Sequence, residues 1–257
     1  MIKYRIKTRV GGIVRDTQRV DKVLSNLGIG TRKEIKRLVK EGAVKVDGVV
    51  ITDSGMHINP KDSLIEVSGE LLKYREFIYL MLNKPQGVVS ATYDSTLQTV
   101  IDILPDEYKS FGLFPVGRLD IDTEGLLVLT NNGQLAHELL SPKKHVPKRY
   151  YAIVEGIVDE RDREAFREGV VLDDGYKTLP AELFIIKSSG FSEIETVIYE
   201  GKFHQIKRMF KAVGKKVKYL KRIEMGKLKL DEALRPGECR ELTNEEVLLL
   251  KAVETVN

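Results

Sequence analysis

Apolar residues recur at helical spacing near the start of the chain. They lie three or four positions apart over residues 20–27 and predict an amphipathic helix. Thr31 and Glu34 form the capping-box pattern that opens a second helix, and Gly42 is expected to end it. Residues 43–51 form two short apolar runs around an Asp-Gly pair, which predicts a β-hairpin.

The rest of the chain alternates strands with helices. Strands are predicted near residues 77–82, 113–118, 126–130, 148–154, 181–187, 192–199 and 217–224. Helices are predicted near residues 97–104, 133–140, 160–168, 203–213 and 243–253. Several neighbouring strands are joined without room for a crossover helix, so the sheet should be largely antiparallel or mixed. The expected fold class is therefore α+β, with helices flanking the sheet.

Charge is distributed unevenly along the 257 residues. Residues 1–74 hold 15 Lys and Arg against 9 Asp and Glu, a net charge of +6, and the remaining 27 bases and 29 acids give −2. Residues 202–229 carry 11 bases and one acid. Such segregation costs self-repulsion, and an anionic polymer is the usual partner that explains it. Four segments are predicted: a basic extension at 1–18, a small domain at 19–67, a linker at 68–76 and a larger domain at 77–257.

Composition excludes several classes of protein. The single cysteine, Cys239, rules out an internal disulfide framework, and the four histidines lack the close spacing that indicates a zinc site. We therefore expect no metal and no redox chemistry. No apolar run approaches the roughly 20 residues that span a bilayer, and no signal-peptide pattern opens the chain. A cytoplasmic protein without a membrane partner is expected.

The strongest candidate for chemistry is the sequence GRLDIDTEG at residues 117–125, which precedes an apolar run. Asp120 follows Arg118 and enters a glycine-closed turn, which suits a pre-oriented carboxylate nucleophile or base. Two simpler interpretations compete: the acidic residues satisfy backbone groups in a turn, or they open a calcium loop. The calcium pattern fails at its twelfth position, because Asn131 cannot supply the required bidentate carboxylate.

Two further segments are candidates for the same site. Residues 148–156 predict a strand in which only one of Tyr150 and Tyr151 can face a cleft, although a tyrosine in a strand is as often structural. The turn at residues 83–87 should break the preceding strand, and its Lys84 could touch RNA or merely decorate a loop.

The predicted helix at residues 203–213 has two distinct faces. Its apolar positions, expected to be buried, are Phe203, Ile206, Phe210 and Val213. Its polar face carries His204, Lys207, Arg208 and Lys211. A cation on that face could pair with Asp120 or bind phosphate.

Cations also share one face of the second helix of the small domain, namely Arg32, Lys33, Lys36, Arg37 and Lys40. A charged helix face is most often only a solvated face. Here a hairpin follows immediately, and the motifs RVDKVL at residues 19–24 and GAVKVDG at residues 42–48 accompany it. The segment resembles the small RNA-binding domain named after ribosomal small-subunit protein four. That resemblance implies that the five cations hold RNA without reading its sequence.

Four motifs follow in the larger domain. They are MLNKPQGVVS at residues 81–90, GRLDIDTEGLLVLTNNG at 117–133, KRYYAIVEG at 148–156 and EGKFHQIKRMF at 200–210. In this order they resemble the pseudouridine synthases of the RsuA group, over nearly all of residues 19–250. The resemblance implies isomerisation of a uridine in ribosomal RNA: the glycosidic bond breaks, the uracil turns, and carbon 5 is rejoined to the ribose. It implies no cofactor and no metal.

The resemblance also implies roles for individual residues. Asp120 would be the essential carboxylate, attacking the anomeric carbon or the base, or removing a ribose proton. Tyr150 would stack on the extruded base and help remove the proton at carbon 5, and Lys207 would pair with Asp120 and keep it anionic. Further RNA contacts are expected from Lys84, Arg118, His204, Arg208 and Lys211.

The expected substrate also comes from the resemblance. The run from His204 to Lys207 resembles the small-subunit enzymes of the group, so uridine 516 of 16S ribosomal RNA, free or in an assembling particle, is the expected target. A 23S enzyme of the same group and a non-catalytic assembly factor are alternatives, although mere binding would not require Asp120, Tyr150 and Lys207 together. A glycoside hydrolase needs two carboxylates flanking the bond, and the basic setting suits RNA better than neutral sugar. We expect a monomer.

Overall fold

The chain divides into two compact units. In the computed structural model, the described residues are 17–72 and 74–252, and the units meet in the sequence between Glu76 and Phe77. The basic extension predicted for residues 1–18 lies outside the described residues, except for its last two. No helix in the described part of the chain is long and apolar enough to cross a membrane.

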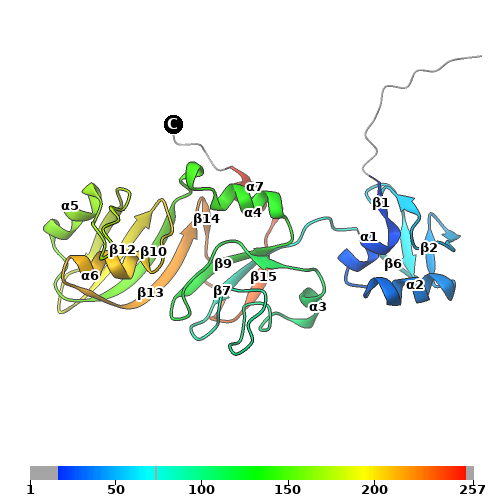
Figure 1. Ribbon diagram of the computed structural model, residues 1–257, viewed down its shortest axis with the longest axis horizontal. Helices are drawn as coiled ribbons and strands as arrows, with labels where there is room; N and C mark the ends of the chain where they lie inside the picture. Colours follow the sequence, from blue (N-terminus) through cyan, green and yellow to red (C-terminus); the bar gives the residue numbers. More distant parts are fainter. Residues whose placement is uncertain (1–16, 73, 253–257) are drawn as a thin grey trace, which may run out of the picture. The chain divides into compact units, whose positions relative to one another are not determined.

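The first unit combines two helices with a small sheet (Figure 1). Its helices are α1 (Val20–Asn26) and α2 (Arg32–Lys40), and its sheet has the order β3-β2-β5-β6. The strands are β2 (Val44–Val46), β3 (Val49–Val50), β5 (Ile65–Val67) and β6 (Glu70–Leu72), and β1 (Gln18–Arg19) pairs separately with β4 (His57–Ile58). The capping box is present, because the Thr31 amide donates to the Glu34 carboxylate at 2.8 Å and the Glu34 amide donates to the Thr31 hydroxyl at 3.4 Å.

Strand β6 corrects the predicted linker. It lies within residues 68–76 and pairs with β5 in an antiparallel hairpin. The two residues that connect these strands, Ser68 and Gly69, both have positive φ, as a tight type I′ hairpin turn requires. The polar Ser-Gly pair, which in the sequence looks like the start of a linker, is the turn of a hairpin.

A mixed sheet forms the second unit. Within its described residues, nine strands have the order β11-β12-β10-β13-β9-β7-β15, with β14 beside β13 and β8 beside β9. They are β7 (Tyr79–Lys84), β8 (Phe114–Pro115), β9 (Glu124–Thr130), β10 (Lys148–Glu155), β11 (Glu182–Lys187), β12 (Phe191–Ile198), β13 (Lys216–Met225), β14 (Leu228–Lys229) and β15 (Cys239–Glu241). The β9–β13 pair is parallel and the other pairs are antiparallel. The α+β class and the largely antiparallel sheet are therefore confirmed.

Helices cover this sheet on both faces. They are α3 (Asp106–Lys109), α4 (Gly133–Leu140), α5 (Glu160–Glu168), α6 (Gln205–Ala212) and α7 (Asn244–Lys251). Figure 1 shows α5 and α6 beside β10 and β12, and α4 and α7 beside β9 and β14. Successive residues of β9 alternate between two cores: Leu127 shares a core with Phe166 and Phe210, and Leu126 shares the other with Leu135. Strand β9 is thus buried on both faces, and the turn that contains Asp120 leads directly into this buried strand.

Two sequence predictions about local structure are wrong. Residues 97–104 form turns and no helix, because the Thr99 amide and hydroxyl both donate to the Asp102 carboxylate at 2.8 Å and compete with helical hydrogen bonds. Strand β7 does not break at Asn83. It continues through Lys84, which pairs with Gly125 of β9.

Gly125 lies where β9 and β13 approach too closely for any side chain. Its φ is +105°, and an added Cβ would lie 2.2 Å from the carbonyl oxygen of Arg222 on β13. Gly125→Ala should lower the free energy of unfolding by more than about 2 kcal/mol, because backbone atoms must move apart. Gly133→Ala is the matched control, since a Cβ there meets nothing within 4 Å. Urea denaturation of both variants measures the difference, and equal stability would contradict the tight β9–β13 contact.

Candidate active site

Asp120 lies in a turn that neighbouring backbone groups hold in place. The Ser90 hydroxyl donates to the Leu119 carbonyl at 2.9 Å and accepts from the Leu119 amide at 3.1 Å. The Thr123 amide donates to the Asp120 carbonyl at 3.0 Å, and the Gly87 amide donates to the Ile121 carbonyl at 2.8 Å. The first sequence motif, residues 81–90, thus supports the second. Ser90 is a supporting residue that the sequence prediction missed, although it ends that motif.

Lys84 is a buried side chain that also holds the turn of Asp120 in place. Its side chain has no exposed surface, and its ammonium donates to the carbonyl oxygens of Pro85 at 2.9 Å, Asp120 at 3.1 Å and Thr123 at 3.1 Å. Burial lowers the pKa of Lys84 to about 8, against the attraction of nearby carboxylates. The predicted RNA contact of Lys84 is therefore wrong: the side chain holds the turn of Asp120 from inside.

The carboxylate of Asp120 faces a cation from helix α6. Lys207 Nζ lies 2.8 Å from Asp120 Oδ2 and 2.5 Å from Asp122 Oδ1. Burial alone would lower the pKa of Lys207, but hydrogen bonds and attraction from both aspartates outweigh it and raise the pKa. Partial burial alone would raise the pKa of Asp122, but the hydrogen bond and the attraction from Lys207 outweigh it and lower the pKa. Asp120 is the more shielded carboxylate, with a side chain 26% exposed against 63% for Asp122.

Tyr150 and Asp120 line the same cavity. Its volume is about 70 Å³, and its lining includes Arg118, Thr123 and His204. Tyr150 lies on the face of β10 that points into the core with Ala152. Tyr151 points to the other face, where its hydroxyl donates to Glu193 at 2.9 Å. Of the two tyrosines, Tyr150 is thus the one placed beside the carboxylate.

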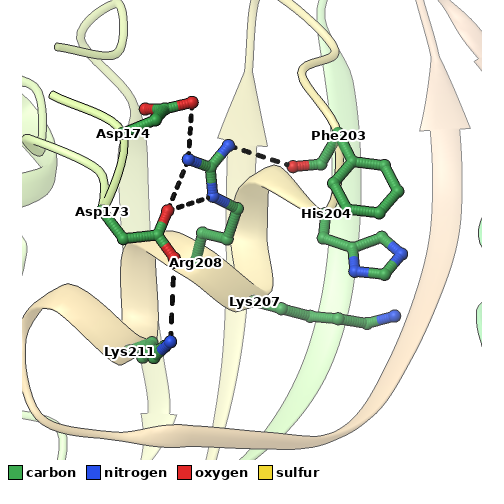
Figure 2. Close-up of a pocket in the computed structure, with 7 residues that line it drawn as sticks. All are labelled: Asp173, Asp174, Phe203, His204, Lys207, Arg208 and Lys211. Carbon is green, nitrogen blue, oxygen red and sulfur yellow. Dashed lines mark hydrogen bonds and ion pairs between the residues drawn. The ribbon is translucent and has the colours of Figure 1, made fainter. Parts of the chain in front are cut away.

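A larger cavity adjoins helix α6. Its volume is about 570 Å³, and it is lined by Asp173, Asp174, Phe203, His204, Lys207, Arg208 and Lys211 (Figure 2). Arg208 Nη2 lies 2.5 Å from Asp173 and 2.7 Å from Asp174, and its side chain is only 16% exposed. A phosphate would have to displace both carboxylates to reach Arg208. Lys211 and Arg118 remain more accessible, so they are better placed for RNA.

The start of α6 differs from the predicted helix. The helix begins at Gln205, and His204 before it has a positive φ of 48°. Phe203 therefore lies outside the helix and is 73% exposed, which makes its predicted burial wrong. Its ring stacks on the His204 ring, with centroids 3.8 Å apart, and His204 Nε2 lies 3.7 Å from Asp120 Oδ1. Helical periodicity could not reveal this turn, because it depends on one left-handed residue.

The sequence itself is similar to known proteins in both units. The S4 domain family matches residues 18–64, and the RNA pseudouridylate synthase family matches residues 78–212. The chain belongs to the RNA pseudouridylate synthase family. In the described residues of this pseudouridine synthase, no cluster of three or more His, Cys, Asp or Glu could hold a metal ion.

Relatives match nearly the whole chain. An uncharacterized RNA pseudouridine synthase of Bacillus subtilis, YtzG, is 54% identical over 90% of this chain and 98% of its own. Ribosomal small subunit pseudouridine synthase A of Vibrio cholerae is 41% identical, covering 89% and 97%. Ribosomal large subunit pseudouridine synthase B of Bacillus subtilis is 39% identical, covering 92% and 96%. A crystal structure of a pseudouridylate synthase superposes with a TM-score of 0.64 at 35% identity, covering 90% of this chain and 99% of that one.

The buried Lys84 ammonium predicts a pH effect. Its pKa is about 8 in the folded chain, against an ordinary value of 10.5. Between these values the unfolded chain binds more protons, so the contribution of Lys84 to the free energy of unfolding rises with pH over that window. An NMR titration of the Lys84 Cε should show a midpoint near pH 8, with Lys84→Met assigning the signal. A side chain that stays fully charged at pH 10 would contradict this burial effect.

Proposed function

We propose that this enzyme converts uridine to pseudouridine in ribosomal RNA, with Asp120 as its essential carboxylate. One observation carries the proposal: Asp120 is paired with Lys207 at 2.8 Å at the edge of a cavity that Tyr150 also lines. A partly buried carboxylate with a fixed cationic partner is suited to act as a nucleophile or base. Simple RNA binding by an assembly factor would require only exposed cations and would not favour this arrangement.

The geometry supports a mechanism in which the uridine leaves its helix. A base inside an RNA stack cannot reach a carboxylate that lines a small cavity, so it must be extruded. The ring of Tyr150 would then lie against the uracil while Asp120 acts on the nucleoside. Lys207 would keep Asp120 charged as solvent is excluded, because an unpaired charge would be too costly in such a site.

We infer that the target lies in small-subunit RNA, at uridine 516 of 16S ribosomal RNA. The inference rests on the resemblance of the His204-Gln205 pair, at the start of α6, to the small-subunit enzymes of the group. The identities to the small-subunit and large-subunit relatives, 41% and 39%, are too similar to favour either target. A 23S target is thus the alternative. We also propose that the protein is a cytoplasmic monomer, as the sequence predicts.

Exposed cations of the first unit would hold the RNA. All five cations of α2 predicted from the sequence are exposed, and the structure gives Arg37 one weak pairing with Glu41 at 3.7 Å. Phosphate contacts by such side chains provide affinity without sequence specificity. In the second unit, Arg118 and Lys211 would contribute further phosphate contacts, and Arg208 would do so only after leaving its aspartate partners.

Asp120→Asn tests the proposed chemistry. It should abolish pseudouridine formation while RNA binding is retained, because the amide keeps the shape of the side chain and lacks its charge. Asp122→Asn is the matched control, since Asp122 also pairs with Lys207 but is largely exposed. Pseudouridine is mapped chemically in 16S and 23S transcripts after incubation with each variant. Normal product formation by Asp120→Asn would remove Asp120 from its proposed role.

The same mapping decides the target. Ribosomal RNA from cells with and without the protein should differ at one uridine of 16S RNA. A difference confined to 23S RNA would replace the proposed target with the alternative and would leave the chemistry of Asp120 intact.

If the cations of α2 bind phosphates, removing them should make RNA binding less sensitive to salt concentration. Replacing Lys36 and Lys40 together with Gln should reduce the slope of log K against log salt concentration by roughly 0.7 to 1 for each phosphate that the variant no longer binds. Lys45→Gln is the control, because Lys45 already pairs with Glu66 at 2.7 Å. Filter binding of 16S transcripts at several salt concentrations measures the slopes. Identical slopes for both variants would show that α2 does not face RNA.

A further inference from the structure

Phe203 is an exposed aromatic ring beside the active site. Its side chain is 73% exposed, and His204 stacks on its ring at 3.8 Å, with an interplanar angle of 16°. Figure 2 shows this stacked pair at the cavity beside α6, with Lys207 extending past the His204 ring. Exposed apolar side chains are common on protein surfaces, and Phe203 is distinguished by its contact with His204, which also lines the cavity of Asp120.

The turn that carries Phe203 is held on several sides. The Gln205 side chain accepts from the Lys202 amide at 2.9 Å and donates to Glu200 at 3.0 Å. The Lys202 ammonium lies 4.4 Å from the centroid of the Tyr176 ring. His204 adopts a left-handed backbone with φ 48°, which is costly for a residue other than glycine. The ring of Phe203 is therefore presented by a defined backbone.

His204 stands between two cavities. It lines the small one together with Asp120 and Tyr150, and it lines the large one together with Phe203. Asp120 approaches the His204 ring from one side, with Oδ1 3.7 Å from Nε2, and Phe203 stacks on the ring face. Under the proposed function the extruded uracil lies beside Asp120 and Tyr150, so the ring of Phe203, next to His204, is positioned for the neighbouring base in the RNA.

We propose that Phe203 is a stacking platform for the nucleobase adjacent to the extruded uridine, which rests on the proposed function above. Extruding a uridine breaks its stack with that neighbour, and a new stack on Phe203 compensates for the broken one. Aromatic side chains accept any base in this way, because every base has a π face. His204 would support the ring of Phe203 by stacking on it, and it also lies next to Asp120. Phe203 is thus a positioning residue, and it does not touch the reacting atoms.

Substitutions of Phe203 test the platform. Phe203→Ala and Phe203→Leu should lower the rate constant of pseudouridine formation at saturating enzyme by roughly 5- to 150-fold, the range expected for one base stack. Phe203→Tyr and Phe203→Trp should retain most of the rate, because they keep a flat ring. Phe191→Ala is the matched control, since Phe191 is 56% exposed at the far end of β12. Single-turnover reactions on the transcript that wild type modifies measure the rates, and melting temperatures check folding.

A second measurement separates stacking from a structural role. Two short RNAs are compared, one with an abasic residue on the 5′ side of the mapped uridine and one with it on the 3′ side. On one of these RNAs, wild type and Phe203→Ala should form pseudouridine at the same rate, because the base that Phe203 stacks on is missing. A wild-type rate for Phe203→Ala, equal losses for Phe191→Ala, or failure of the ring-bearing variants to restore activity would overturn the platform. So would a difference that persists at both abasic positions. Failure of the proposed function looks different, because wild type itself would then form no pseudouridine.

Discussion

The ion pair between Asp120 and Lys207 connects two parts of the chain that are far apart in sequence. Asp120 comes from the turn before β9, and Lys207 comes from the first turn of α6. A carboxylate in this half-buried position would be unfavourable without a cation, and the cation would be unfavourable without a carboxylate. Each therefore stabilises the charge of the other, and the site forms only when the sheet brings the turn and the helix together.

The sheet fixes this meeting point in two ways. Strands β9 and β13 run side by side through a contact so close that Gly125 has no room for a Cβ. Beneath the turn, the buried Lys84 ammonium binds three backbone carbonyl oxygens within 3.1 Å, which leaves the backbone of Asp120 little freedom. A buried charge that interacts with carbonyl dipoles costs desolvation, and the pKa of Lys84 records that cost. The burial of Lys84 is thus unfavourable by itself, and it fixes the backbone that carries the Asp120 carboxylate.

Much of this arrangement follows from sequence patterns, and the exceptions have physical causes. The capping box at Thr31, the strand that carries Tyr150 and helices α4 and α5 follow from periodicity and local chemistry, which act over a few residues. The burial of Lys84 does not follow from the sequence, because no local pattern tells a buried lysine from an exposed one. It depends on carbonyl groups about 36 residues away along the chain. The exposure of Phe203 is equally hidden, because a single left-handed residue, His204, shifts the start of α6.

Replacing Lys207 tests most directly whether its charge maintains the active carboxylate. Lys207→Met removes the charge and keeps much of the side-chain volume, whereas Lys207→Arg keeps the charge. Single-turnover pseudouridine formation should fall by about 100-fold or more for Met, the loss typical of a missing electrostatic stabiliser, and much less for Arg. Lys187→Met, on β11 and 65% exposed, should have little effect. A Lys207→Met enzyme as fast as wild type would contradict the account at its centre.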